Sequence, residues 1–443
     1  MFSNLKNVFK VPDLRNKILF VMAMVALYRV GVAIRVPGID ADAVRQFKAA
    51  ANTQGALGFF NLFSGGAFAS FSIFALGIMP YITASIIMQV LGVVIPKLEK
   101  LQQEGAVGQR KITQYTRYLA IGISTLQATA LTFIFGNGNG NAFFGAAQNF
   151  PQNLRLLPDG MWPRGYLVIA TLVGGTAVLM WLGELISQRG IGNGMSMVIF
   201  ASVVSSLPSG FYNVYLGKGW FVFTLLLLLC LGIVVAVVKV ELAQRRIPVQ
   251  FAKRVVGRRM YGGQSTYIPL KVNQSGVVPI IFASSVLLLP VLLTNLLGSA
   301  EEGSWRFAVQ DWVDENLVNS QNLIYIVLFS LMIIAFAYFY NSIAFDPIRQ
   351  ADQIRRQGGF IPGVRPGPQT ERYLGKAVNR ITLPGAVFVA LIAITPYLLL
   401  WAFDVQNFPF AGTTVLIAVG VALELMRQID SQLMLRNYEG FLK

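Results

Sequence analysis

The chain has 443 residues and is 55% hydrophobic, but only 13% of its residues are charged and its formal net charge is +16. Soluble proteins usually carry about a quarter charged residues, so this composition excludes an ordinary soluble globular protein. A single cysteine excludes both a disulfide framework and a Cys-x-x-Cys metal site. The absence of histidine removes the most common metal ligand and general base. We therefore expect neither an enzyme nor a bound cofactor.

Residues 1–17 form a basic, amphipathic segment with no cleavage site of small residues, so we expect this segment to remain on the cytoplasmic side. Apolar runs long enough to cross a membrane, about 20 residues each, follow it. The alternating pattern of a β-barrel is absent, so all spans are predicted to be helical. The ten predicted spans are Ile18–Ile34, Ile73–Ile95, Tyr118–Phe135, Tyr166–Ile186, Ile191–Leu207, Trp220–Val240, Gly276–Leu297, Leu323–Ile343, Ile381–Ala402 and Thr413–Ile429.

Lysine and arginine are distributed unequally between the two sets of connections. Of the 36 basic residues, 28 fall on the side of the two termini, seven fall on the other side, and Arg29 lies within the first span. Basic residues accumulate in cytoplasmic connections. The count therefore places both termini in the cytoplasm, and it supports ten spans because removing one would scramble the asymmetry.

An external connection at residues 208–219 divides the spans into an N-terminal half (18–207) and a C-terminal half (220–430), followed by a cytoplasmic tail (431–443). With five spans in each half, the second half enters the membrane from the opposite side. Two related halves would then be inverted repeats with the functional site between them. This is a geometric inference, since no residue-level repeat is visible. The same architecture suits a secondary transporter of a small solute, which stays open as an alternative function.

Two connections on the cytoplasmic side are long and basic. Residues 239–273 contain the pair Arg245 and Arg246 and a Gly-Gly turn between β-prone residues, which predicts a hairpin. Residues 345–380 contain a predicted short helix and a Gly/Pro turn around Arg365. Attraction to anionic lipids would explain the charge. Docking of a large partner with a phosphate-rich surface, such as ribosomal RNA, would also explain the defined backbone around Arg365.

A short apolar segment, Asn61–Phe71, precedes the second span and is interrupted by small and polar residues such as Gly65 and Gly66. Irregular backbone at membrane depth survives only where protein or a water-filled cavity surrounds it. We therefore expect this segment inside the protein and away from lipid.

Ionisable residues are scarce within the spans. Arg29, Glu184, Lys239 and Glu424 lie toward helix ends, whereas ion-coupled transporters usually place paired charges near mid-membrane. Two aliphatic pairs, Ile82 with Ile86 and Ile199 with Val203, are spaced four apart and share helix faces. Spacing alone makes these pairs ordinary packing residues.

Five strings occur in order along the chain: FNLFSGGAFASFSIFALGIMPYITASIIMQ, EGAVGQRKITQYTRY, WLGELISQRGIGNGMSMVIF, STYIPLKVNQSGVVPIIFASS and GGFIPGVRPGPQT. Together they resemble the SecY family, the channel-forming subunits of the bacterial protein translocase, over essentially the whole chain. The resemblance implies an all-α membrane protein of ten helices, in which two inverted five-helix halves form a clamshell around a central pore. It also implies a short helix that plugs the closed pore.

The resemblance assigns roles by position. The plug is Asn61, Leu62, Phe63, Ser64, Gly65, Gly66, Ala67, Phe68, Ala69, Ser70 and Phe71. The aliphatic pore ring is Ile82, Ile86, Ile199, Val203, Ile281 and Ile417. Polar residues lining a lateral gate are Ser85, Gln127, Ser284 and Ser285, and partner-docking residues are Arg245, Arg246, Arg258, Arg259 and Arg365. Val203 replaces the isoleucine common at its position, but it is also β-branched and apolar, so the seal should survive.

A narrow aliphatic ring suits a channel for unfolded chains, because it offers water no hydrogen bonds and tends to dewet. The implied function is to translocate unfolded secretory polypeptides across the bacterial cytoplasmic membrane and to release membrane segments sideways into lipid. An external motor or the ribosome would supply the energy. The implied partners are the subunits SecE and SecG, the motor ATPase SecA, the ribosome with its RNA, secretory precursors and their signal sequences, and anionic lipids.

Overall fold

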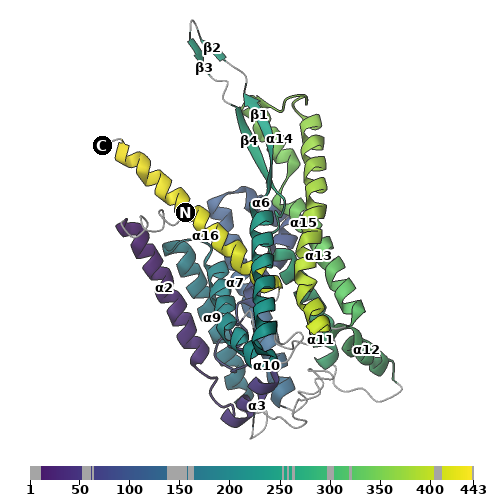
Figure 1. Cartoon of the computed structure of the whole chain (residues 1–443). Helices are drawn as coiled ribbons and strands as arrows, with labels where there is room; N and C mark the ends of the chain where they lie inside the picture. The colour runs from purple at the N-terminus through teal and green to yellow at the C-terminus, as the bar shows by residue number, and fades with distance from the viewer. Residues whose placement is uncertain are drawn as a thin grey trace.

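The computed structural model describes residues 11–51, 61, 64–136, 157, 164–251, 254–256, 259–261, 265–296, 304–318, 322–403 and 412–441. The described chain is mostly helical (Figure 1). Its helices are α2 (Pro12–Ala33), α3 (Ala41–Ala51), α5 (Met79–Val94), α6 (Pro96–Gln103), α7 (Ala106–Gly136), α9 (Arg164–Arg189), α10 (Gly194–Leu242), α11 (Val278–Leu296), α12 (Trp305–Val313), the π-helix η1 (Asp314–Val318), α13 (Leu323–Ala344), α14 (Pro347–Arg356), α15 (Pro368–Phe403) and α16 (Gly412–Phe441). Its strands are β1 (Gln244–Phe251), β2 (Arg254–Val256), β3 (Arg259–Tyr261), β4 (Ser265–Lys271) and β5 (Gly359–Phe360).

Each of the ten predicted spans falls on a helix: α2, α5, α7, α9, the two arms of α10, α11, α13, α15 and α16. Within the described residues, six helical segments are long and apolar enough to cross a membrane, and α5 with α6 makes a seventh if that bent pair is one span. The bend between α5 and α6 is 106°. It occurs where Pro96 follows Ile95, because proline cannot donate to the helical ladder.

The connection expected at residues 208–219 is helical up to Lys218, which differs from the loop predicted there. Gly219 alone breaks the helix, with a backbone φ of 78° that glycine tolerates without strain. The two arms of α10 then pack against each other, with the rings of Tyr215 and Phe223 5.8 Å apart. Proline at position 208 is accommodated within the first arm.

The start of the second span was also predicted wrongly. The sequence predicts helix from Ile73, but residues 64–78 form successive turns and α5 begins at Met79. The apolar run hides this boundary because buried turns and buried helices have the same composition.

Further along, the Nε of Arg117 donates to Glu184 at 2.6 Å and so joins α7 to α9.

Three apolar clusters fill the membrane part. One contains Phe68, Phe71 and Leu172 and lies among the N-terminal elements. Another contains Ile280, Phe329 and Val389 and lies among the C-terminal helices. The third joins both sets, since it contains Ile86 and Ile199 as well as Ile281 and Ile417. The site described below is built on this third cluster.

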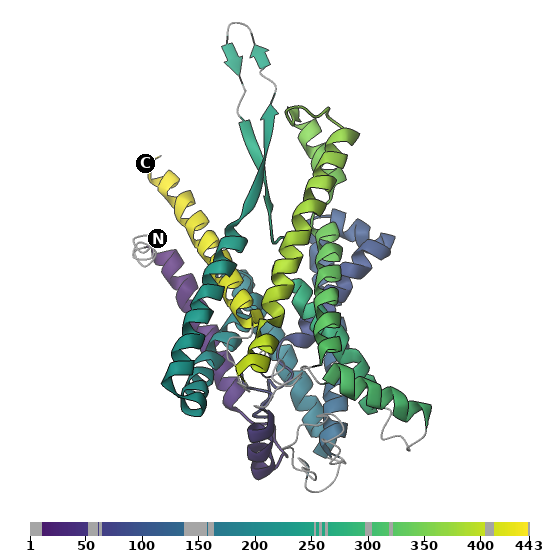
Figure 2. The same ribbon diagram turned by 45° about the vertical axis from the view of Figure 1, so that its right-hand side comes forward.

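The two basic loops fold into one unit, which we call the basic unit and define as residues 244–271 and 345–378. Strand β1 pairs with β4 as an antiparallel hairpin (Figure 2). On its other edge, β1 pairs with β5. Apolar residues from both loops share a core, among them Ile247, Leu270 and Leu374. At its base α15 approaches the chain so closely that a Cβ on Gly385 would lie 2.3 Å from the Val272 carbonyl oxygen.

The basic unit, the start of α2 and the end of α16 all lie at one end of the helical bundle, while α3 and α12 lie at the other (Figures 1 and 2). This is the arrangement that the uneven distribution of lysine and arginine predicts. The end of the bundle with the basic unit is called the basic end below.

Candidate functional site

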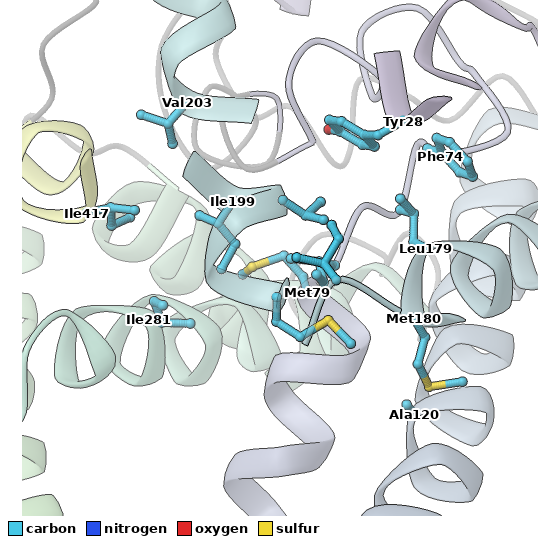
Figure 3. Close-up of a cluster of buried hydrophobic side chains, with 14 of the residues drawn as sticks. Tyr28, Phe74, Met79, Ala120, Leu179, Met180, Ile199, Val203, Ile281 and Ile417 are labelled. Carbon is cyan, nitrogen blue, oxygen red and sulfur yellow. The ribbon is translucent and has the colours of Figure 1, made fainter. Parts of the chain in front are cut away.

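The six residues assigned to the pore ring come together. Ile86, Ile199, Val203, Ile281 and Ile417 are buried members of one cluster, and the half-buried Ile82 packs against it. Figure 3 shows Ile281 and Ile417 facing Ile199 and Val203 across this cluster. The side chains come from α5 and α10 on one side and from α11 and α16 on the other. The result is a collar without a single hydrogen-bonding side-chain atom, set between two groups of helices.

The segment Asn61–Phe71 lies directly beside this collar. Ala67 belongs to the collar cluster, and Phe68, Ala69 and Phe71 belong to the adjoining N-terminal cluster. Ala67 is 0% exposed and Phe68 2%. Leu62 and Phe63 lie outside the described residues. The expectation that this segment is enclosed by protein is met by every residue from Ser64 to Phe71, since each is buried or half-buried.

Local side chains fix the shape of the segment. The Asn61 side-chain oxygen accepts from the backbone N–H of Ala69 at 3.1 Å, and the Ser64 hydroxyl accepts from that of Phe68 at 3.0 Å. Such side-chain acceptors compete with regular helical bonding, which explains why residues 64–71 are a series of turns. Gly65 and Gly66 both have positive φ, 63° and 87°, which glycine adopts without strain.

Helix α2 holds the segment by polar contacts, and one of these contacts is shared with α10. The Tyr28 hydroxyl of α2 donates to the Ser64 carbonyl at 2.8 Å and lies 2.6 Å from the Ser202 hydroxyl of α10. Next to it, Arg29 donates to the Gly65 carbonyl at 3.1 Å. The fit is close, because a Cβ on Gly65 would lie 2.9 Å from the Tyr28 hydroxyl and 3.0 Å from the Cα of Ser202. Sequence reasoning missed Tyr28 and Ser202, which look like isolated polar residues in apolar helices.

The segment is closely packed. Its described apolar residues, Ala67, Phe68, Ala69 and Phe71, are buried, and its backbone is bonded to α2, whose Tyr28 is bonded in turn to α10. The chain that follows is held as well. The Ile73 N–H donates to the Ile34 carbonyl at 3.0 Å, and Gly175 of α9 leaves no room for a Cβ beside the Ile73 carbonyl. Ile73 is thus held by contacts separate from those that hold residues 64–71.

The four proposed gate residues lie on three helices. Ser85 is on α5, Gln127 on α7, and Ser284 and Ser285 on α11. Helix α11 contacts both α5 and α7. The Ser284 hydroxyl donates to the Ile281 backbone carbonyl at 3.0 Å. The side-chain amide oxygen of Gln127 and the hydroxyl of Ser285 are buried and have no hydrogen-bond partner within the described structure. Buried polar atoms without a partner cost free energy.

A polar cavity of about 610 Å³ reaches the collar from the basic end. Ile417 of the collar lines it, together with Glu241, Lys271, Glu424 and Arg427. Glu241 accepts from the Asn273 side chain at 2.7 Å, which fixes the start of the α11 connection to the end of α10. Charged side chains and the collar residue Ile417 therefore line the same cavity.

Three of the assigned docking arginines, Arg245, Arg246 and Arg365, are exposed in the basic unit. Arg245 and Arg246 are exposed on β1, and the Arg246 guanidinium lies 4.8 Å from the centre of the Tyr267 ring. Arg365 is exposed in the turn before α15, where the Thr370 hydroxyl donates to its carbonyl at 2.9 Å. Arg259 belongs to β3, and Arg258 lies outside the described residues. The predicted hairpin and the ordered turn around Arg365 are both present.

Comparison with known proteins gives the same family at every level. The profile of the SecY family matches residues 72–426. The chain is 48% identical to the protein translocase subunit SecY of Streptomyces galbus and 48% identical to that of Mycobacterium tuberculosis, each over 100% of both chains.

Solved structures share the fold. A protein-conducting channel aligns with a TM-score of 0.56 at 19% identity, and a SecY structure used to study the plug domain aligns with 0.60 at 21% identity. In both cases the match covers 93% of this chain and 90% of the other. Family membership excludes the alternative of a secondary transporter, and it assigns a channel subunit rather than a catalytic enzyme. The chain belongs to the SecY family of protein translocase subunits.

Proposed function

We propose that this member of the SecY family of protein-conducting channels seals its pore with the collar of Ile82, Ile86, Ile199, Val203, Ile281 and Ile417, and that residues 61–71 are the plug beneath it. The observation that carries this proposal is the single apolar cluster formed by the six side chains from both groups of helices. The polar cavity supplies the entrance, and an unfolded chain would pass from it through the collar. In the closed state the collar excludes water because it offers no hydrogen bonds.

The two groups of helices are the halves of the clamshell, and the contact of α11 with α5 and α7 is the lateral gate. Ser85, Gln127, Ser284 and Ser285 line that contact. The unpaired polar atoms of Gln127 and Ser285 favour this assignment, since they make the closed contact easier to open. An apolar signal sequence entering there would reach the lipid phase.

The basic unit is the docking surface for the motor SecA and for the ribosome, with Arg365 and the hairpin arginines as contacts to acidic or phosphate-rich surfaces. A structural relative at 18% identity was solved in a canine ribosome–channel complex, which fits this role. SecE and SecG are the partner subunits, and secretory precursors are the substrates. The basic end faces the cytoplasm, in the cytoplasmic membrane of a bacterium, where anionic lipids also meet it.

Asparagine substitutions test the collar with matched controls. Ile281 and Ile417 are 4% and 3% exposed in the collar, whereas their chain neighbours Ile280 and Leu416 are 1% and 0% exposed in the C-terminal core. Ile281→Asn and Ile417→Asn are expected to raise ion leak through the idle channel in planar bilayers and to admit precursors with defective signals. Ile280→Asn and Leu416→Asn should lower folding yield without a comparable leak. Equal leak in collar and control variants would refute the collar assignment.

A further inference from the structure

Helix α12, together with η1, links the two C-terminal helices α11 and α13 at the end of the bundle opposite the basic unit. It projects sideways from the bundle (Figures 1 and 2). Ser304 begins it, with its hydroxyl accepting from the Arg306 N–H at 3.2 Å. Its far end is held, because Val313 and Leu317 are buried in the C-terminal core and the Gln310 side chain donates to the Thr294 carbonyl of α11 at 3.0 Å.

A separate face of α12 is apolar and exposed. Trp305, Val309 and Trp312 follow one another at the i, i+4, i+7 spacing of a single helix face. Trp305 is 72% exposed, Val309 47% and Trp312 52%. Burying a tryptophan side chain is strongly favourable in free energy. We therefore expect an apolar neighbour to cover this stripe.

The adjacent helix α13 indicates what this apolar neighbour is. Leu323, Val327 and Leu331 form an exposed stripe along the first turns of α13, at 72%, 56% and 61% exposure. Only 17% of the most apolar 18-residue stretch of this span is buried in the protein. In a membrane this stripe therefore faces lipid. Helix α12 lies at the same end of the bundle as the start of α13 (Figure 1), so its exposed apolar stripe is at the depth where α13 enters the membrane. Tryptophan concentrates at that depth, with its ring in the acyl boundary and its N–H among headgroups.

Charge on α12 fits the same position. Arg306 stands beside Trp305, with its guanidinium 5.8 Å from the ring, where it can reach lipid phosphates. Asp311 is exposed and falls on a different face from the tryptophan stripe, where it remains in water. An amphipathic helix with these features lies in the membrane interface.

We propose that α12 is an in-plane anchor in the lipid interface on the side opposite the basic unit, and that it fixes the ends of α11 and α13 at a set depth in the bilayer. Its ligand is the headgroup and upper acyl region of the membrane. Because α11 carries gate residues, the anchor would hold one side of the gate while the other side moves. The proposal that α12 is an anchor rests only on the chain being a membrane protein. It does not depend on the assignment of the gate residues.

Fluorescence of single tryptophans tests this anchor. The chain has six tryptophans, and variants of the full-length protein would keep only Trp305 or only Trp312, with phenylalanine at the other positions. In phosphatidylcholine vesicles, both are expected to emit at short wavelength and to be quenched more by bromines near the headgroup than by bromines near the bilayer centre. A variant that keeps only Trp181, which is 59% exposed on α9 and lies within a span, provides the reference for deep quenching.

Three results would overturn the anchor. Quenching by aqueous iodide with no effect of brominated lipid would place the stripe in water. Short-wavelength emission insensitive to both quenchers would mean that protein, such as a second copy of the chain, covers the stripe. Deep quenching equal to that of Trp181 would place α12 within the membrane core instead of at its interface.

Discussion

The hydroxyl of Tyr28 lies 2.6 Å from the hydroxyl of Ser202, and the same Tyr28 oxygen donates to the Ser64 carbonyl of the proposed plug. One buried atom therefore links α2, α10 and the plug. Tyr28 is 1% exposed and Ser202 0%, so water cannot replace these bonds while the plug is seated. In the proposed function, the pair would act as a latch on the plug, held by these two hydrogen bonds.

Removing the latch hydroxyl should loosen the plug without creating a large cavity. A buried hydrogen bond contributes about 1 kcal/mol, so Tyr28→Phe is expected to shift the plug toward its displaced state by roughly fivefold. The idle channel should then pass more ions in planar bilayers and accept precursors with weakened signals. Tyr325→Phe is the control, because the Tyr325 hydroxyl bonds Tyr397 at 3.4 Å far from the plug in the C-terminal core. Equal leak from both variants, or from neither, would contradict the latch.

The two plug glycines differ in what surrounds them, which allows a matched pair. Both have positive φ, so alanine strains the backbone at either position by about 1 kcal/mol. Only at Gly65 would the new Cβ also meet Tyr28 and Ser202, whereas nothing lies within 4 Å at Gly66. Gly65→Ala should therefore raise idle ion conductance well above Gly66→Ala. If Gly66→Ala leaks as much, backbone strain and not the fit against Tyr28 controls the seal.

Two neighbouring serines on α11 allow a test of how stable the closed state of the proposed gate is. The Ser285 hydroxyl is buried without a partner, and the Ser284 hydroxyl bonds the Ile281 carbonyl. Ser285→Ala removes an unsatisfied group and should stabilise the closed contact by about 1 kcal/mol. Crosslinking of a signal sequence to lipid-exposed gate positions should then fall severalfold, while Ser284→Ala changes it less. Increased crosslinking in Ser285→Ala would show that the hydroxyl stabilises the closed gate.

Charge reversal tests the docking surface. Arg365→Glu should strongly slow precursor translocation driven by the motor or the ribosome, because an acidic or phosphate-rich partner is repelled. Membrane insertion of the channel itself should be normal. Arg356→Glu makes the same charge change elsewhere in the basic unit, at the end of α14, and measures how much of the effect comes from net charge alone. If Arg365→Glu leaves the translocation rate unchanged, the basic residues of the loops act only in membrane topology and in attraction to anionic lipids.

Much of this fold is predictable from the sequence because long apolar runs and basic connections are local signals. All ten spans fall on helices, and the hairpin between Arg246 and Tyr267 was expected from its turn and β-prone residues. The start of α5 at Met79 was not predictable, since the turns before it are as apolar as a helix. The collar depended on family resemblance, because the spacing of Ile82 and Ile86 alone indicates only packing.

Long-range contacts account for what the sequence could not provide. Nothing in residues 239–273 indicates that β1 pairs with β5 of the second loop, because that pairing joins segments about a hundred residues apart. The contact of Tyr28 with Ser202 is hidden for the same reason. Tight packing of the plug was likewise unforeseen, since its burial depends on α2, α9 and α10 closing around it.

The contact between Gly385 and the Val272 carbonyl has a mechanical consequence. At this point the hairpin, the first residues leading to α11, and α15 meet without an intervening side chain. Proline at position 384 removes one bond from the helical ladder of α15 at the same level. In the proposed function, this close contact would couple the basic unit to the base of α11, so that a tilt of the basic unit by a docked motor would be passed on to a helix of the proposed gate.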